Sequence, residues 1–155
     1  MLRGPSRTDG RPLRILLVED NLDHVVITRQ AVTSILPCEV EVVNDGGKAV
    51  EWLTRSATPT GRTPERRDPD LILLDLHLPV MNGIDVLRWI RRQPSYHGTP
   101  VIVLTAAGDD EALILDCYAS GANSFLPKPA TDKRFAEALR VLAGSPQLPA
   151  DSSSA

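Results

Sequence analysis

Apolar residues along this chain fall into short runs separated by amphipathic stretches. Two of the runs are wholly aliphatic, Leu-Ile-Leu-Leu at 71–74 and Val-Ile-Val-Leu at 101–104. Such runs are typical of strands covered on both faces of a parallel sheet. A third apolar run spans 13–18, and residues 39–43 alternate in the manner of an edge strand with one wet face. With a last short strand expected at 123–126, the pattern predicts five strands.

Apolar positions at helical spacing fill the intervals between those runs. Asn21 is expected to cap the first helix and Asp109 the fourth, while Asn82 or Gly83 suits the start of the third. The expected helices cover about residues 22–36, 46–53, 85–93, 110–120 and the stretch from 131 or 132 onward. Strand and helix thus alternate five times. With right-handed crossovers, this predicts an α/β fold with a doubly wound, five-stranded parallel sheet in the order 2-1-3-4-5.

Composition narrows the class of protein without naming one. The chain has 155 residues, of which 42% are apolar and 24% charged, values that suit one soluble globular domain. A net charge of −3 offers no basic surface for nucleic acid, and no apolar run is long enough to cross a membrane. Cys38 and Cys117 are isolated and lack metal-ligand spacing. We therefore expect a reduced, cytoplasmic protein that binds neither nucleic acid nor membranes.

The segments outside the periodic part are polar or rich in Pro, Gly and Ser. Residues 1–12 carry arginines but no apolar core of a secretory signal, and we expect them to be a disordered lead-in. Residues 144–155 are expected to be a disordered tail, which leaves one domain at 13–143. Within it, the Arg-, Thr- and Pro-rich stretch at 55–69 predicts a long loop, either a recognition element or a tolerated insertion.

Polar residues stand at the carboxyl ends of four predicted strands: Glu19 and Asp20, Asp75, Thr105 and Lys128. In the predicted order these strands are neighbours, so the side chains should meet in one crevice. Three carboxylates together would repel one another, and a hard cation with oxygen ligands, Mg²⁺, would relieve that repulsion. Lys128 and Thr105 suit phosphoryl oxygens. Asp75 is then the candidate nucleophile that would form an acyl phosphate.

Four motifs at these strand ends make the chain similar to a known family. They are Val-Glu-Asp-Asn at 18–21, Leu-Asp-Leu-His-Leu-Pro-Val-Met-Asn-Gly at 74–83, Leu-Thr-Ala at 104–106 and Leu-Pro-Lys-Pro at 126–129. Over about residues 13–143 the chain resembles the receiver domain of two-component response regulators, which has a flavodoxin-like fold. Each motif alone is a weak signal, but all four in order at strand ends make a strong one.

The resemblance implies a phosphorylation site and a metal site. Asp75 would accept a phosphoryl group from a sensor histidine kinase. Mg²⁺ would be bound by Asp20, Asp75 and the backbone carbonyl of His77, with Glu19 acting through a water molecule. Glu19 stands where many members have aspartate, which lengthens the reach to the metal. The protein would catalyse its own phosphorylation and dephosphorylation and would not be an enzyme acting on other substrates.

The same resemblance implies how a switch would work. Thr105 and Lys128 would bind the phosphoryl oxygens, and Phe125 would be the aromatic switch residue that fills the space Thr105 leaves. Phe125 lacks the hydroxyl of the frequent tyrosine, so it can act by burial but not by hydrogen bonding. The Lys128–Pro129 peptide bond would be cis.

Two features resemble a smaller group, the single-domain regulators paired with bacterial phytochrome-type histidine kinases. One is the insertion at 56–69, and the other is the lack of a predicted effector domain. Those relatives tend to dimerise through the last helices and strand. On the helix expected at 110–120, Leu115 lies outside the core stripe and Tyr118 lies at its edge. Both are therefore predicted interface residues of a homodimer.

Two other functions stay open at this point. An aspartyl-nucleophile phosphatase would place a second carboxylate two residues after the nucleophile, where this chain has His77. A receiver-like scaffold that is never phosphorylated would have no use for the acidic pocket. The side chain of His77 either shields or assists water at the acyl phosphate, or has no role. His24 is expected to be solvated.

Overall fold

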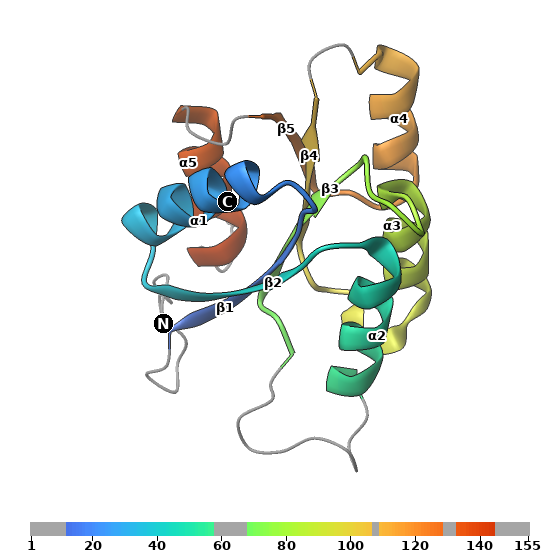
Figure 1. Cartoon of the computed structure of the whole chain (residues 1–155), viewed down its shortest axis with the longest axis horizontal. Coiled ribbons are helices and arrows are strands. Elements are labelled where there is room, and N and C mark those ends of the chain that lie inside the picture. Colours follow the sequence, from blue (N-terminus) through green and yellow to red (C-terminus); the bar gives the residue numbers. More distant parts are fainter. Residues whose placement is uncertain (1–11, 58–67, 107–108, 129–132, 145–155) are drawn as a thin grey trace, which may run out of the picture.

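Five parallel strands form one sheet through the middle of the molecule (Figure 1). The computed structural model describes residues 12–57, 68–106, 109–128 and 133–144. The strands are β1 (Leu13–Val18), β2 (Cys38–Val43), β3 (Leu71–Asp75), β4 (Val101–Thr105) and β5 (Ser124–Pro127). Their order is β2-β1-β3-β4-β5, and every neighbouring pair is parallel. The predicted strand order is confirmed.

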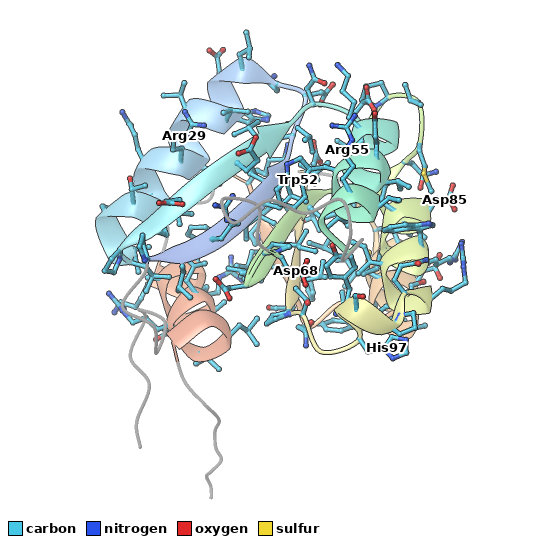
Figure 2. All side chains as sticks on the ribbon, turned by 90° about the horizontal axis from the view of Figure 1, so that it is seen from below. Arg29, Trp52, Arg55, Asp68, Asp85 and His97 are labelled. Atoms are coloured by element: carbon cyan, nitrogen blue, oxygen red, sulfur yellow. The ribbon has the colours of Figure 1, made fainter. Side chains whose placement is uncertain are left out.

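Helices cover both faces of this sheet. They are α1 (Leu22–Ile35), α2 (Gly46–Ala57), α3 (Gly83–Arg92), α4 (Glu111–Ala119) and α5 (Lys133–Leu139), with a 3-10 turn, η1 (Pro94–Tyr96), and a π-helical turn, η2 (Arg140–Gly144). α1 and α5 lie on one face, and α2, α3 and α4 on the other (Figure 1). Charged side chains such as Arg29 and Arg55 lie on the outside (Figure 2). Among the helices described, none is long and apolar enough to cross a membrane.

The apolar runs of the sequence become the two halves of the core. Every residue of β3 and β4 is buried, as predicted for strands covered on both faces. Alternate residues point to opposite faces: Ile72 and Leu74 pack with α2 and α3, whereas Leu71 and Leu73 pack with α1 and α5. The two glutamates of β2 are exposed, which confirms the predicted edge strand with one wet face.

The turn after β3 is tight because α3 begins against the end of the strand. Asn82 caps α3, and its side chain accepts a hydrogen bond from the backbone N–H of Asp85 at 3.0 Å. A Cβ on Gly83 would collide with the backbone carbonyl of Asp75, so glycine is required there. The capping role belongs to Asn82, and Asp75 lies at the carboxyl edge of the sheet.

One predicted helix cap is wrong. Asp110, and not Asp109, caps α4, because the Asp110 side chain accepts the backbone N–H of Leu113 at 2.9 Å. The carboxylate of Asp109 is engaged elsewhere, since it accepts the backbone N–H of Ala106 at 2.7 Å. The helix therefore begins at Glu111, one residue later than predicted, and it ends before Gly121, whose φ of 113° suits the expected terminal glycine.

Several expectations fall wholly or partly outside the described residues. α2 continues to Ala57, so the structure replaces the first residues of the predicted 55–69 loop with helix. Most of that loop, the start of the last helix at 131 or 132, the Lys128–Pro129 bond and nearly all of the two terminal segments lie outside the part of the chain that is described. The domain boundaries at 13 and 143 stay a prediction.

Candidate functional site

Three carboxylates gather where β1 and β3 end. Glu19 and Asp20 follow β1 directly, and Asp75 is the last residue of β3. Each offers an oxygen that lies within 4.8 Å of the oxygens offered by the other two. Glu19 and Asp75 are buried, at 1% and 2% exposure, whereas Asp20 is exposed. The convergence expected from the strand order is thus present, with one carboxylate open to solvent.

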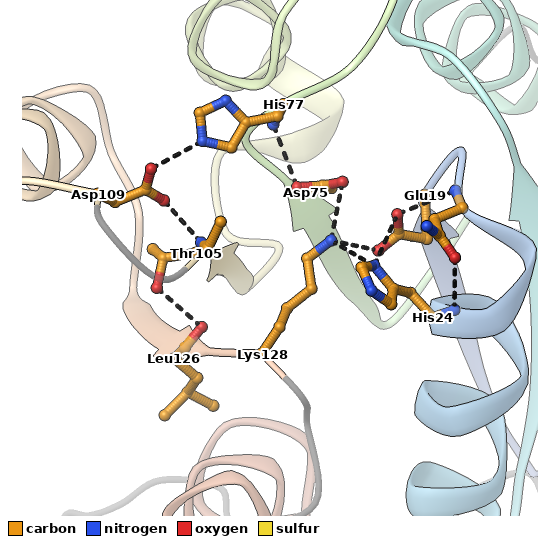
Figure 3. Close-up of polar contacts among 10 residues, drawn as sticks. Glu19, His24, Asp75, His77, Thr105, Asp109, Leu126 and Lys128 are labelled. Carbon is orange, nitrogen blue, oxygen red and sulfur yellow. Dashed lines mark hydrogen bonds and ion pairs between the residues drawn. The ribbon is translucent and has the colours of Figure 1, made fainter.

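An ammonium group lies between the two buried carboxylates (Figure 3). Lys128, just after β5, places its Nζ 2.9 Å from Oε1 of Glu19 and 3.1 Å from Oδ2 of Asp75. The lysine side chain is itself only 12% exposed. Charged groups removed from water in this way are stable only when paired, and these three pair with one another.

Burial and the hydrogen bond between Glu19 and Lys128 have opposite effects on the pKa of each group. Burial raises the pKa of Glu19 above its ordinary value, and the nearby charge of Asp75 adds to the increase, while the hydrogen bond from Lys128 opposes it. Burial alone would lower the pKa of Lys128. Its hydrogen bonds to Glu19 and Asp75 and their negative charges outweigh burial, so the pKa of Lys128 is raised. The lysine therefore stays an ammonium.

The donor set fits a hard divalent cation. One ammonium faces three carboxylates, so uncompensated negative charge remains, and carboxylate oxygens are the ligands that Mg²⁺ prefers. Asp20 and Asp75 are the residues that would hold the ion, with Glu19 beside them. The backbone carbonyl of His77 as a further ligand stays a prediction. The structure shows instead that the backbone N–H of His77 donates to Oδ1 of Asp75 at 3.1 Å.

Thr105, the last residue of β4, is buried beside the cluster, but its hydroxyl is directed elsewhere. It donates to the backbone carbonyl of Leu126 on β5 at 3.4 Å, as Figure 3 shows. The structure therefore brings Thr105 to the predicted edge of the sheet without directing its hydroxyl at Asp75. Its role toward phosphoryl oxygens stays a prediction that requires a side-chain rotation.

The predicted switch and interface residues lie next to one another. The ring of Phe125, half-buried on β5, packs edge to face against Tyr118 of α4, with ring centroids 5.4 Å apart and an angle of 81° between the rings. Tyr118 is 45% exposed and Leu115 is 61% exposed. The aromatic residue proposed to switch is thus in direct contact with one of the two residues proposed for an interface.

Two histidines make contacts that the sequence did not predict. His24 was expected to be solvated, yet its Nδ1 lies 3.0 Å from Nζ of Lys128 and 3.7 Å from Oε2 of Glu19. Nε2 of His77 lies 2.8 Å from Oδ1 of Asp109. The sequence signal that could have indicated this contact of His24 is its position in the first turn of a helix that starts at the acidic cluster. The direction of the His24 side chain depends on how α1 is rotated against the sheet.

Comparison with known proteins gives relatives of one kind. The family model for the response regulator receiver domain matches residues 15–140. The probable methanogenesis regulatory protein FilR2 of Methanothrix harundinacea (strain 6Ac) is 36% identical over 119 residues, which are 76% of this chain and 73% of FilR2. The transcriptional regulatory protein CpxR of Escherichia coli (strain K12) is 33% identical over 129 residues, which are 83% of this chain. The chain spans only 48% of CpxR, about half of that relative's length.

Solved structures agree with this result. The bacteriophytochrome response regulator AtBRR is 31% identical with a TM-score of 0.72, covering 90% of this chain and 98% of its own. The Mn²⁺-bound response regulator Rcp1 is 28% identical with a TM-score of 0.70, covering 90% of this chain and 100% of its own. The phosphorylated cyanobacterial phytochrome response regulator RcpA is 32% identical with a TM-score of 0.67, covering 83% and 89%. With the strand order and the acidic edge described above, these matches show that the chain belongs to the receiver domains of response regulators in two-component signalling.

Proposed function

We propose that this receiver domain accepts a phosphoryl group from a sensor histidine kinase on Asp75, in a reaction that requires Mg²⁺. The position of the Asp75 carboxylate carries the proposal. It is buried at the end of β3, 3.1 Å from the ammonium of Lys128, and shares a cluster with the carboxylates of Glu19 and Asp20. One similar structure is described as phosphorylated and another as Mn²⁺-bound, which supports both parts of the proposal.

In the proposed reaction a phosphoryl group passes from a histidine of the kinase to the carboxylate of Asp75. A carboxylate oxygen of Asp75 attacks phosphorus, and the new P–O bond forms as the P–N bond to the kinase's phosphohistidine breaks and the imidazole takes up a proton. Lys128 shifts one N–H from Asp75 to a phosphoryl oxygen, and Thr105 turns its hydroxyl from the carbonyl of Leu126 toward another. Mg²⁺ bound at the carboxylates supplies charge neutralisation for the phosphoryl oxygens. Water later hydrolyses the acyl phosphate, which releases inorganic phosphate and restores the carboxylate.

Labelling with a radioactive small-molecule phosphodonor, acetyl phosphate, tests the acceptor. We expect Mg²⁺-dependent labelling of the wild-type chain, no labelling of Asp75→Asn, and unchanged labelling of the control Asp85→Asn, whose carboxylate is exposed on α3. Labelling of Asp75→Asn at the wild-type rate would remove Asp75 from this role. No labelling of any form would favour the scaffold alternative. Steady turnover of small phosphate esters would favour the phosphatase alternative, which family membership does not support.

The proposed phosphodonor in the cell is a phytochrome-type sensor kinase, and the proposed location is the cytoplasm. The likeness to AtBRR and RcpA supports this choice, because both are described as phytochrome response regulators. Phosphotransfer from a purified bacteriophytochrome kinase should be faster than transfer from an unrelated sensor kinase at equal concentration. Equal or slower transfer would exclude the phytochrome pairing while leaving Asp75 as the acceptor.

The proposed output is a change in partner binding or in homodimer formation through the face that carries Leu115, Tyr118 and Phe125. When Thr105 turns toward the phosphoryl group it vacates space beside β5, and the ring of Phe125, in contact with Tyr118, can move into it. Two packings that differ by only a few kcal/mol are enough for a usable population shift.

Sedimentation velocity with Mg²⁺ and beryllofluoride, a mimic of the phosphoryl group, tests the output. We expect the mimic to increase the dimer fraction of the wild-type chain and to have no such effect on Phe125→Ala or Leu115→Glu. Val26→Glu, a matched change of an exposed apolar residue on α1, should respond like wild type. A Phe125→Ala variant with an unaffected response would exclude the ring as the switch.

A further inference from the structure

The ammonium of Lys128 has three acceptors within hydrogen-bond distance, and the mechanism above uses only Asp75. The three protons of a lysine ammonium can each be donated once. Here the acceptors are Oε1 of Glu19 at 2.9 Å, Oδ2 of Asp75 at 3.1 Å and Nδ1 of His24 at 3.0 Å (Figure 3). Because an ammonium has no acceptor site of its own, the contact at 3.0 Å is a hydrogen bond when Nδ1 of His24 carries no proton.

His24 is held in place independently of Lys128. The backbone N–H of His24 donates to the side chain of Asn21, the residue that caps α1, at 3.1 Å. The histidine thus lies in the first turn of a helix that begins next to the acidic cluster, and its side chain is 39% exposed. It holds Lys128 from α1, an element that contributes no other acceptor to this ammonium.

A neutral acceptor suits this position better than a carboxylate would. The cluster already contains Glu19, Asp20 and Asp75, and a fourth negative charge would add repulsion. The imidazole accepts the third proton without adding charge. Glu19 and Asp75 are also the groups whose bonds to the lysine would change when a cation or a phosphoryl group is bound. His24 is not among the carboxylates that would hold the cation, and its other contact, from Nδ1 to Oε2 of Glu19, is longer at 3.7 Å.

We propose that His24 is a positioning residue that holds the ammonium of Lys128 by its third proton, in reach of the Asp75 carboxylate. When Asp75 receives a phosphoryl group, one N–H of Lys128 changes its acceptor from Asp75 to a phosphoryl oxygen. A second N–H stays hydrogen-bonded to His24. The bond itself stands on the geometry of this chain. Its effect on the rate of phosphorylation rests on the proposed function.

The test compares variants of the whole chain by ¹⁵N NMR of the Lys128 ammonium, without any phosphodonor. In wild type we expect a resolved ammonium signal, because three acceptors slow its exchange with water. His24→Phe keeps a ring but removes the acceptor, and the signal should broaden beyond detection. His24→Asn places an amide oxygen near the position of Nδ1 and should restore the signal, whereas His24→Gln reaches one bond farther and should not. His97→Phe, at an exposed position directly after η1 and away from α1 (Figure 2), is the matched control and should leave the signal unchanged.

The rate of labelling by acetyl phosphate gives the second readout. His24→Phe should lower that rate about threefold to tenfold, the range that corresponds to one lost hydrogen bond of typical strength, and His24→Asn should restore it. An unchanged ammonium signal in His24→Phe, or a lost signal with an unchanged rate, would overturn the proposal. If the wild-type chain is never labelled, the proposed function fails, and the ammonium signal still decides whether His24 holds Lys128. Ring ¹⁵N chemical shifts of His24 in the wild-type chain give a further check. Shifts that show a proton on Nδ1 would also overturn the proposal that His24 accepts a hydrogen bond from Lys128.

Discussion

Val80 adopts a backbone conformation that β-branched residues avoid. Its φ is 72°, and it is the one non-glycine residue with positive φ in the described ranges. The N–H of Met81 donates to the carbonyl of Pro79 at 2.8 Å, which closes a three-residue turn with Val80 at its centre. The same carbonyl accepts the N–H of Gly46 at 3.3 Å, so the turn ties the β3–α3 loop to the start of α2. The loop after the proposed phosphoacceptor therefore stores strain at an 85% exposed side chain.

Replacing Val80 with a residue that tolerates positive φ should stabilise the protein. Val80→Gly should raise the free energy of unfolding by about 1 kcal/mol, because glycine has no Cβ to clash at positive φ and little burial is lost. Urea unfolding measures the change. Val80→Ala keeps most of the backbone penalty and is the control, with an expected change near zero. Equal stability of the two variants would mean that the turn is not strained by valine.

Two loops are joined across the carboxyl edge by one carboxylate. Asp109, before α4, accepts the backbone N–H of Ala106, which follows β4, at 2.7 Å, and it also contacts Nε2 of His77 at 2.8 Å. His77 belongs to the loop between β3 and α3. The start of α4 is held separately by Asp110 through the N–H of Leu113. Neighbouring aspartates therefore serve different elements.

Amide hydrogen exchange can separate these two roles. Asp109→Ala should speed exchange of the Ala106 amide about tenfold, the factor that corresponds to one lost hydrogen bond, and leave the Leu113 amide protected. Asp110→Ala should do the reverse and lower the stability of α4 by about 1 kcal/mol, as expected for a lost cap. If both variants release the same amides, the loop and the helix open as one unit.

The balance of charge at the carboxyl edge sets how the whole molecule responds to a cation. Three carboxylates lie near one lysine. Lys128 donates to Glu19 and Asp75, so within the described cluster the exposed Asp20 is repelled by the other two carboxylates without a hydrogen bond from the lysine. A cation bound only by the folded state would stabilise it by about 2.7 kcal/mol at a hundred times the dissociation constant. The folded state should therefore be less stable in chelator than in Mg²⁺.

Urea unfolding in chelator and in Mg²⁺ checks this expectation. Asp20→Asn should raise the free energy of unfolding by about 0.5 kcal/mol in chelator, since it removes only repulsion, and should lose most of the stabilisation that Mg²⁺ gives wild type. Asp23→Asn is the control, because Asp23 is an exposed acid in the first turn of α1, where its charge is favourable. It should lower stability slightly and keep the full response to Mg²⁺. An Asp20→Asn protein with a full response would exclude Asp20 as a ligand.

The strand order and the place of the site could be predicted because they follow from short-range patterns. The wholly apolar runs that became β3 and β4 can be buried only between two layers of helices, and right-handed crossovers then leave few topologies. The caps at Asn21 and Asn82 could be predicted as well, because each side chain accepts a backbone N–H only three residues farther along the chain. Asp109 and Asp110 were not separable in this way, because either side chain can cap a helix. Asp109 instead accepts the N–H of Ala106 and contacts His77, which lies in the loop after another strand.

From the sequence alone it follows which residues end the parallel strands, and therefore that Glu19, Asp75 and Lys128 share one edge of the sheet. Folding in three dimensions settles which of their atoms meet. The hydroxyl of Thr105 is directed at β5, and the ring of His24 completes the hydrogen bonds of Lys128. Neither contact has a local signal, because a hydrogen bond forms or fails over less than an ångström. For Thr105 that distance is set by the pairing of β4 with β5, and for His24 it is set by how α1 packs on the sheet.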